Sequence, residues 1–265
     1  MSYHPEHPEH LLVTVQDQIK TITFNQPQKK NAISVDMAYH LRDVIEQTRE
    51  DDSRVIILTG TDGNFCSGAD LDASLMNGKP FDVTTFLRRT YNPIVTAMRE
   101  INKPFIAKVS GACVGVGFNF ALACDMIYAA EGSRFSQIFS RIGLSSDGGG
   151  AFFLPEKIGY HKAYELMVTN AIIEATEAKQ LGLVNQLFAA DELDAAVAEI
   201  AARLATGPYV AIQHIKSNLR AGVTKGLEAA LEQEALAQGD NFRTSDFFEG
   251  VFAFLQKRKP NFKGK

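Results

Sequence analysis

The sequence has little of what marks a disulfide-bonded or membrane-spanning protein. Its three cysteines, Cys66, Cys113 and Cys124, are an odd number without CxxC spacing, and each lies in an apolar or glycine-rich run. Such cysteines are typically small buried thiols, which favours a reducing compartment. No apolar stretch approaches the roughly 20 residues that span a bilayer, and the N-terminus lacks the basic and apolar regions of a signal peptide. We therefore predict a cytoplasmic protein without a membrane partner.

An excess of basic residues is also lacking. The 27 Lys and Arg residues against 31 Asp and Glu residues give a net charge of −4. This charge offers no broad positive field, so we expect no nucleic-acid partner, and an anionic ligand would need local donors. With 265 residues, 45% hydrophobic and 22% charged, the chain can form one large core or a core with a small appendage.

The first ten residues lack an apolar period. Prolines interrupt the run HPEHPEH at positions 4–10, so residues 1–10 are predicted to form a flexible, solvated tail. Its histidines, His4, His7 and His10, indicate no more than adventitious metal binding. We predict no metal in the functional site.

Strand patterns begin at Leu11. Two runs at 11–15 and 19–24 flank a polar turn and predict a pair of antiparallel strands. Continuous apolar runs at 55–58, 105–109 and 126–129 suit strands that are covered on both faces. Helical patterns separate them, one after Ser34, one at 86–101 and one at 118–123. This alternation indicates an α/β core with a mostly parallel sheet.

After about Tyr160 the pattern becomes largely helical. A short strand is predicted at 184–187. We predict a core at 11–200 and a C-terminal helical region at 201–265. The expected helices lie at 162–168, 176–180, 192–204, 210–221, 227–238 and 245–257.

Three glycine-containing loops, at 64–70, 110–117 and 143–150, lie where open α/β sheets bind ligands. The second runs directly into a helical pattern, so its N–H groups can hold an anion or a developing oxyanion. Tight turns and close helix packing explain the first two loops equally well, and an N-cap role explains Asp147 in the third. Neither GxGxxG nor a Walker-type GK[ST] is present.

Taken together, these loops resemble those of the enoyl-CoA hydratase/isomerase (crotonase) family over nearly the whole chain. The resemblance implies a ββα spiral core of the ClpP/crotonase type and a C-terminal helical trimerisation region, hence a homotrimer or a dimer of trimers. The matching segments are NQPQKKNAI at 25–33, FCSGADL at 65–71, KPFIA at 103–107, the loop 111–117, ACD at 123–125, AKQLGLV at 178–184, and 249–259.

Carried over residue by residue, the resemblance implies that the N–H groups of Ala69 and Val116 form an oxyanion hole for an acyl-CoA thioester. Coenzyme A is then part of the substrate, and no separate cofactor is expected. The basic C-terminal tail either meets the phosphates of coenzyme A or is simply solvated. The residues implied in substrate binding are Lys30, Ala32, Ser67, Ala69, Asp70, Leu71, Val116, Phe139 and Lys263.

The catalytic carboxylates depart from those of hydratases. The two glutamates that position water in hydratases align here with Asn119 and Phe139, and neither residue accepts a proton at neutral pH. The segment 142–150 resembles GLxxDxGG of 1,2-epoxyphenylacetyl-CoA isomerases, and the same loop supplies the aspartate of dienoyl-CoA isomerases. We therefore predict that Asp147 shuttles a proton in a double-bond isomerase, with a pKa raised by an apolar pocket. Its predicted wall, or else ordinary core, is Phe139, Phe152 and Phe153.

Other reactions on the same fold stay open. Asp147 could act as a nucleophile in dehalogenation or thioester hydrolysis, and a trapped aspartyl ester would reveal it. Enoyl-CoA hydration is a further alternative. A chain without both glutamates could also be a non-catalytic acyl-CoA-binding protein, which turnover of any enoyl-CoA would exclude. The acyl group itself cannot be deduced from the sequence.

Overall fold

The main sheet has six strands in the order β1-β2-β3-β4-β6-β9, of which β1 and β2 are antiparallel and the others parallel. The structure is a computed structural model that describes residues 3–71 and 81–265. Both the antiparallel pair and the parallel sheet confirm the prediction. The strands are β1 (Leu11–Gln16), β2 (Ile19–Phe24), β3 (Val55–Gly60), β4 (Phe105–Val109), β6 (Met126–Ala130) and β9 (Gln186–Phe188).

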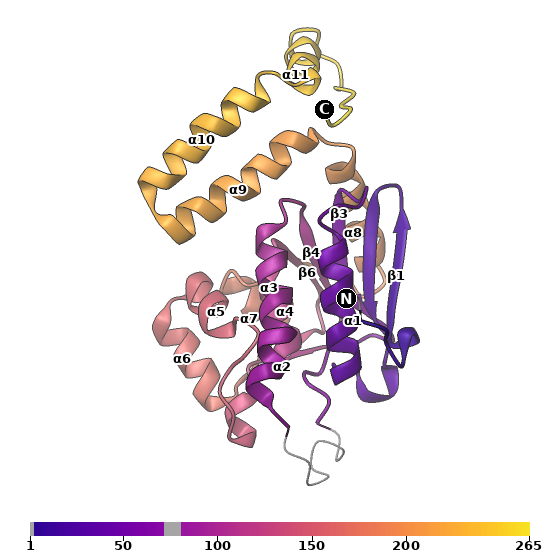
Figure 1. Cartoon of the computed structure of the whole chain (residues 1–265), viewed down its shortest axis with the longest axis vertical. Coiled ribbons are helices and arrows are strands. Elements are labelled where there is room, and N and C mark those ends of the chain that lie inside the picture. The colour runs from indigo at the N-terminus through magenta and orange to yellow at the C-terminus, as the bar shows by residue number, and fades with distance from the viewer. Residues whose placement is uncertain (1–2, 72–80) are drawn as a thin grey trace.

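Helices cover both faces of this sheet (Figure 1). Ile56 and Leu58 of β3 join the large core with α1, α3 and α4, whereas Val55 and Ile57 pack with α8 on the other face. Coverage on two faces explains why the strand is continuously apolar at 55–58. The helices are α1 (Val35–Gln47), α2 (Val83–Arg89), α3 (Tyr91–Glu100), α4 (Val116–Ala123), α5 (Gly150–Ile158), α6 (Tyr160–Thr169), α7 (Ala175–Gln180) and α8 (Leu193–Ala205).

A second sheet was not predicted. It has three strands in the order β5-β7-β8, namely β5 (Ala112–Val114), β7 (Arg134–Ser136) and β8 (Ile172–Glu174). Strands of three residues are too short to show a period of two in the sequence. This sheet carries the second glycine loop, because β5 leads directly into Gly115 and α4.

The helix predicted at 86–101 is two helices. α2 ends at Arg89 and α3 begins at Tyr91, and Thr90 between them has φ −128° and ψ −84°. Pro93 accounts for the break, because it lacks the N–H that would bond to the carbonyl of Arg89 and its ring would clash with that carbonyl. The break sets Tyr91 at the start of α3, where it is buried.

The N-terminal segment at 3–10 is not a free tail. It lies along α1 and contains the 3-10 helix η1 (Pro8–His10). The Asp36 carboxylate, in the first turn of α1, accepts hydrogen bonds from the N–H groups of Glu6 (2.8 Å) and His7 (3.0 Å) and from the Tyr3 hydroxyl (2.7 Å). One helix-start carboxylate therefore orders a segment that composition alone made look disordered.

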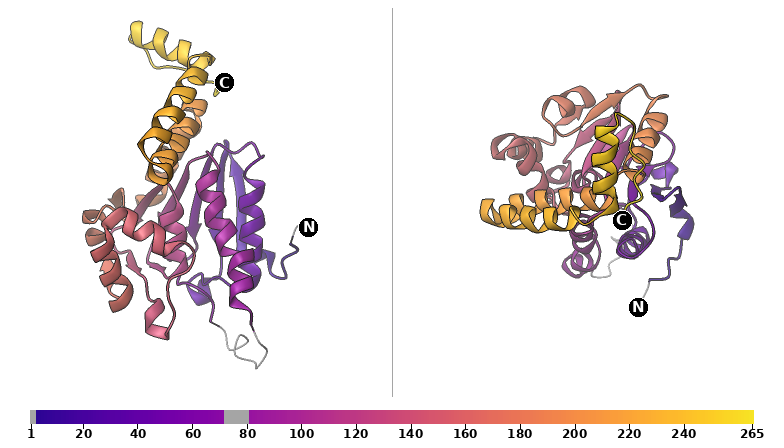
Figure 2. Two further views of the ribbon diagram at one scale, coloured as in Figure 1. Left: turned by 60° about the vertical axis from the view of Figure 1, so that its left-hand side comes forward. Right: turned by 90° about the horizontal axis from the view of Figure 1, so that it is seen from above.

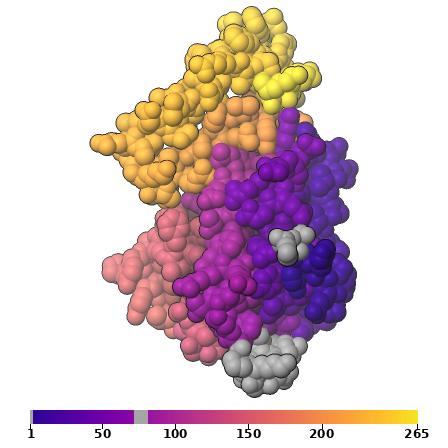
Figure 3. All heavy atoms as spheres, viewed as in Figure 1, coloured from indigo at the N-terminus to yellow at the C-terminus, as the bar shows by residue number. Residues whose placement is uncertain are grey.

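The C-terminal helices α9 (Tyr209–Lys225), α10 (Leu227–Asn241) and α11 (Ser245–Leu255) extend away from the core, and we call them the arm (Figures 1 and 2). The arm begins later than the predicted boundary at 201, because Ala201 and Ala205 of α8 are buried against the sheet. Figure 3 shows that the arm projects from one end of the molecule. Its exposed apolar side chains include Leu219, Leu227, Leu231, Phe252, Phe254 and Leu255.

Two cations of α9 join the arm to the core. Lys216 Nζ donates to Met98 O (2.8 Å) and to Asp125 Oδ2 (2.8 Å), and Arg220 donates to the carbonyls of Arg99 and Glu100 at 2.7 Å each. Those three carbonyls belong to the last turn of α3. The carbonyl groups of a last turn have no N–H donor within their own helix. Positive charge is also favoured at that end of the helix dipole.

No single helix of the described residues is long and apolar enough to cross a membrane, although α8 and α9, bent by 102° at their junction, meet the length and composition test as a pair.

Candidate active site

Two of the three glycine loops run side by side in parallel. Cys66 pairs with Cys113, with hydrogen bonds from Cys66 N to Ala112 O (2.8 Å) and from Val114 N to Cys66 O (2.9 Å). Farther along, Gly68 lies beside the second loop, since a Cβ on it would lie 3.4 Å from Val114 O and 4.0 Å from Gly115 Cα, and the residues that follow these two glycines are Ala69 and Val116. The structure therefore brings together the two residues that the sequence predicted to form the oxyanion hole.

The N–H of Ala69 points away from its pairing partner. Ile33 bonds to the residues on either side of Ala69, through Ile33 N to Gly68 O (2.8 Å) and Asp70 N to Ile33 O (2.9 Å). In a parallel ladder, the residue between those two bonds directs its own N–H to the opposite side. Within the described residues, that N–H donates to no backbone carbonyl. Ala32, next to Ile33, is buried.

Val116 is the first residue of α4, so its N–H has no acceptor within the helix. Gly115 before it has φ 56° and ψ −129°, a conformation that favours glycine. A Cβ on Gly115 would lie 3.6 Å from the Cα of Gly68, so the two loops touch at their glycines. The buried Val116 side chain faces Gly148, whose Cβ would lie 3.1 Å from Val116 Cγ2. The valine side chain is therefore turned away toward the third loop.

The cysteines are buried and neutral. Cys66, Cys113 and Cys124 are free, fully buried thiols, as predicted. Burial raises the pKa of Cys66 to about 12 and the pKa of the other two thiols as well. A Cβ on Gly117 would lie 2.6 Å from Cys66 Sγ, so the thiol fills the space that the glycine leaves. These cysteines are packing residues and not nucleophiles.

Asp147 carries the perturbed carboxyl group of the three loops. Burial raises its pKa to about 6, against a hydrogen bond from its own backbone that lowers it. Its Oδ1 is buried and has no hydrogen-bond partner in the described chain. The alternative role as an N-cap is wrong, because the N-cap of α5 is Gly149 and no side chain bonds there. The carboxyl group is therefore left available.

A buried polar network holds the Asp147 loop. Asn119 Nδ2 donates to Asp147 O (2.8 Å) and to Ser146 Oγ (3.1 Å), and Gln137 Nε2 donates to Asn119 Oδ1 (2.8 Å). Ser146 Oγ donates in turn to Gln137 Oε1 at 3.3 Å. Asn119 lies one turn after Val116 on α4, so the same helix positions both the predicted oxyanion donor and the carboxylate loop.

Aromatic rings surround these loops. Phe139 is buried, and its ring tip would lie 3.8 Å from a Cβ on Gly115. Phe153 is buried against Gly149, whereas Phe152, also predicted as a wall residue, is 48% exposed. Tyr91 is buried, and its pKa is raised by burial and then by the neighbouring Asp147 charge. Ser146 lies in the third glycine loop, but no pattern in the sequence indicated that Ser146, Tyr91 or Gln137 would lie near Asp147.

The predicted ligand residues of the first loop lie at its surface. Ser67 donates from N to Lys30 O (3.0 Å) and from Oγ to Lys29 O (2.8 Å). The Asp70 carboxylate forms an ion pair with Lys29 Nζ at 2.7 Å. Leu71 is 58% exposed. These contacts fix the loop beside Ala69, and the roles of these residues in substrate binding stay predictions.

Lys263 lies at the other end of the sheet. Its carbonyl accepts a hydrogen bond from Arg54 at 2.9 Å, and its N–H donates to Asp246 Oδ1 at 2.6 Å. Arg54 precedes β3, whereas Ala69 follows the carboxyl end of that strand, and a strand of six residues spans about 20 Å. Within one chain, the structure does not bring Lys263 to the three loops.

Comparison with known proteins agrees with this arrangement. The profile of the family described as "Enoyl-CoA hydratase/isomerase" matches residues 14–265. A Rhodobacter capsulatus protein named "Probable enoyl-CoA hydratase" is 36% identical over 100% of both chains. The 1,2-epoxyphenylacetyl-CoA isomerase of Escherichia coli is 33% identical over 97% of this chain and 99% of its own. The crystal structure of enoyl-CoA hydratase from Bacillus anthracis has a TM-score of 0.89 and 30% identity, covering 97% of this chain and 100% of that one.

Proposed function

Because the chain belongs to the enoyl-CoA hydratase/isomerase (crotonase) family, we propose that it moves a double bond within an acyl-CoA thioester. The observation that carries this proposal is the Asp147 carboxyl group, which is partly buried, has a pKa raised to about 6 and has one oxygen without a hydrogen-bond partner among the residues that the structure describes. It lies on the loop that packs against Val116. A single base next to an oxyanion hole suits proton transfer.

The thioester carbonyl oxygen accepts hydrogen bonds from the N–H groups of Ala69 and Val116. These bonds strengthen as the oxygen becomes an enolate, and the positive end of α4 adds to the stabilisation. Removing one donor of this type typically costs ~10² to 10³ in rate. Backbone donors of this kind are fixed by the fold before substrate arrives, because Cys66 and Ile33 hold the first loop in place.

The Asp147 carboxylate then takes a proton from the carbon next to the thioester carbonyl. The electron pair of the broken C–H bond forms the enolate, whose oxygen lies in the oxyanion hole. The Asp147 carboxylic acid returns the proton farther along the acyl chain, the enolate collapses, and the double bond has moved. With a pKa of about 6, the carboxyl group is largely ionised at pH 7 and still a stronger base than an exposed aspartate.

Hydration is the second candidate, favoured by the name of the 36% identical Rhodobacter capsulatus relative. Water attack requires groups that orient and activate the water. Asn119 is committed to Ser146 and Asp147 through its amide N–H groups, and Phe139 has no polar atom. In hydration, Asp147 would be the single group left to orient and activate the water. Isomerisation needs only one such group, which is why we favour it.

We further propose that the arm joins chains into a trimer or a dimer of trimers. A monomer with this many exposed apolar side chains on one helical unit would carry an unusually large apolar surface. An apolar hollow of about 450 Å³ lies within the arm, lined by residues that include Phe247, Val251, Phe254 and Phe262. In such an assembly Lys263 would meet the phosphates of coenzyme A bound to a neighbouring chain.

The test is a panel of 3-enoyl-CoA, 2-enoyl-CoA and 1,2-epoxyphenylacetyl-CoA substrates, followed by NMR in D₂O. We expect shifted double bonds, any deuterium at the carbon farther along the acyl chain that receives the proton, and negligible hydration of crotonyl-CoA. A hydration rate comparable to isomerisation would favour the second candidate. A trapped aspartyl ester on Asp147 would instead indicate a nucleophilic reaction, and turnover of none of these substrates would contradict the proposal.

A further inference from the structure

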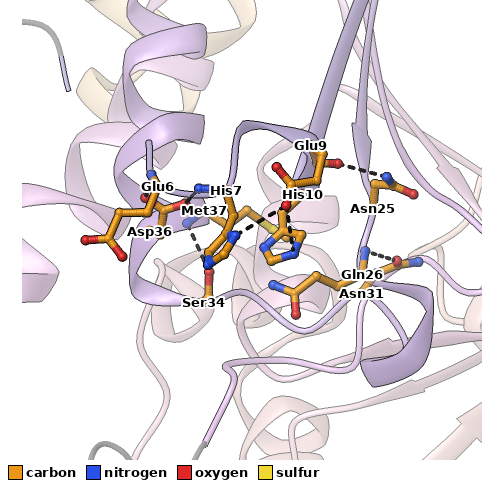
Figure 4. A network of polar contacts seen from close by, with 10 residues as sticks. All are labelled: Glu6, His7, Glu9, His10, Asn25, Gln26, Asn31, Ser34, Asp36 and Met37. Atoms are coloured by element: carbon orange, nitrogen blue, oxygen red, sulfur yellow. Dashed lines mark hydrogen bonds and ion pairs between the residues drawn. The ribbon is translucent and has the colours of Figure 1, made fainter. Parts of the chain in front are cut away.

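The N-terminal segment brings together two imidazole rings and a carboxylate outside the active site. His7 Nδ1 lies 3.3 Å and His10 Nε2 lies 3.8 Å from the same oxygen, Glu9 Oε1. One ligand atom from each of the three residues lies within 4.8 Å of the others, and the two rings are stacked at 4.8 Å (Figure 4). This juxtaposition is independent of the proposed function.

The backbone of all three residues is fixed by hydrogen bonds. His7 N donates to Asp36 Oδ2 (3.0 Å), and His10 N donates to His7 O (3.0 Å). On the other side, Asn25 donates from Nδ2 to Glu9 O and from N to His10 O, each at 2.8 Å. α1 and the end of β2 therefore hold the segment between them (Figure 4). The fold therefore holds the three side chains close together before any ion binds.

From this geometry we propose that His7, Glu9 and His10 bind one divalent transition-metal ion of the zinc type. Bonds of about 2.0 to 2.2 Å to nitrogen and oxygen set tetrahedral ligand separations of about 3.4 Å, close to the two distances measured here. Two imidazoles and one carboxylate are a donor set that zinc uses, with a further position open to water. The third separation, between the ligand nitrogens of the two imidazoles, is at most 4.8 Å, and rotation of the side chains can shorten it toward the tetrahedral value.

The surroundings leave these donors free for an ion. Nδ1 of His10 is buried and has no hydrogen-bond partner in the described part of the chain, so no protein acceptor holds that ring in another orientation. The Glu9 side chain is exposed, so its carboxylate can turn toward an ion. The buried cysteines, with their raised pKa values, do not compete for the metal.

The bound ion would hold residues 7–10 in the conformation in which His7 N bonds to Asp36 at the start of α1. It binds the folded arrangement and not the unfolded chain, so it raises stability in proportion to the logarithm of its free concentration. The start of α1 follows Ile33, which pairs with the Ala69 loop. The ion therefore acts as a structural clamp at the edge of the core, away from Asp147.

The experiment titrates ZnCl₂ into metal-free, untagged full-length protein at pH 7.5 by isothermal calorimetry. We expect one ion per chain for the wild type and for His4→Ala, a control that changes a histidine of the same segment outside the cluster. Changes around metal ligands already cost 10- to 100-fold in affinity, so His7→Ala and His10→Ala should weaken binding by ~100-fold or more. Glu9→Gln keeps the volume and should weaken binding less.

Melting curves in EDTA confirm that the variants fold, since none of the three side chains is in the main core. Adding Zn²⁺ should raise the melting temperature of the wild type and of His4→Ala, that of Glu9→Gln by less, and those of His7→Ala and His10→Ala least. If His7→Ala and His10→Ala bind Zn²⁺ as tightly as the wild type, or if the wild type binds none, the proposed site does not exist.

Discussion

Polar groups near Asp147 are buried and paired with one another, whereas the arm leaves many of its apolar side chains in solvent. Asn119 and Gln137 are almost fully buried and bonded on both sides, while Phe254 of α11 is 83% exposed. A region that satisfies its own groups can be complete within one chain. A region that exposes apolar area gains by contact with another surface. We therefore propose that catalysis belongs to the core and assembly to the arm, and each prediction below tests one side of that proposal.

The largest effect is expected for Asp147→Asn. The amide keeps the volume but cannot accept a proton, so kcat for a 3-enoyl-CoA should fall by ~10² to 10⁴. Because burial raises the folded-state pKa of Asp147, its ionisation disfavours folding increasingly from about pH 4 to pH 6. The variant should thus be as stable as the wild type at pH 4 and more stable at pH 7, by at most about 3 kcal/mol.

Parallel kinetics and melts of Asp147→Asn are compared with Asp240→Asn, an exposed aspartate of the arm. The control should leave kcat unchanged. Retained turnover in Asp147→Asn would move the chemistry to another residue, and a loss of both turnover and stability would make Asp147 a structural group.

The pH dependence gives the next largest effect. The base must be ionised, so kcat/KM should fall about tenfold per pH unit below pH 6, where Asp147 becomes protonated. The measurement is a rate profile from pH 4.5 to 8 with the wild type, and the residual rate of Asp147→Asn should lack this limb. A profile that stays flat down to pH 4.5 would contradict the raised pKa.

A smaller effect is expected for Asn119→Asp. The new carboxylate cannot donate to Asp147 O, and its charge lies beside the loop of the proposed base. We expect kcat to fall by ~10-fold, with KM nearly unchanged and the acid limb of the profile moved to higher pH, because a like charge raises a carboxyl pKa. A simple loss of packing would lower stability without moving the profile.

The smallest effect on chemistry is expected in the arm. Phe254→Asp places a charge on an exposed apolar surface and should dissociate the assembly in analytical ultracentrifugation. Val15→Asp, at an exposed apolar position of β1, is the matched control and should leave assembly intact. The core melt should change by no more than about 0.5 kcal/mol in either variant. An unchanged sedimentation coefficient for Phe254→Asp would remove the arm from the proposed interface.

Much of the core was predictable because its strands and helices have strong periods. The apolar runs at β3 and β4, the Ser34 cap of α1 and the antiparallel β1–β2 pair all match the prediction. Resemblance supplied Ala69 and Val116 as oxyanion donors, and their juxtaposition depends on loop register, which a single sequence does not encode visibly.

What escaped prediction depends on contacts between distant residues. The network of Gln137, Asn119 and Ser146 joins residues up to 27 positions apart, and each is an ordinary polar residue by itself. The ordered N-terminal segment depends on Asp36, about 30 residues away. The division at Thr90 was a different kind of omission, because Pro93 was a local signal that outweighs the helical period.

The cations of α9 bear on whether the chain is modular. Lys216 and Arg220 supply the donors for the carbonyl end of α3, and Lys216 neutralises Asp125. A chain truncated before α9 would leave four main-chain acceptors, the three of α3 and the carbonyl of Lys103, and one carboxylate without these partners, at a cost of about 1 to 3 kcal/mol for each one left buried. The core and the arm, although separate in shape and in role, are thus not interchangeable parts, and gene fusion or domain exchange in this chain should keep α3 and α9 from the same parent.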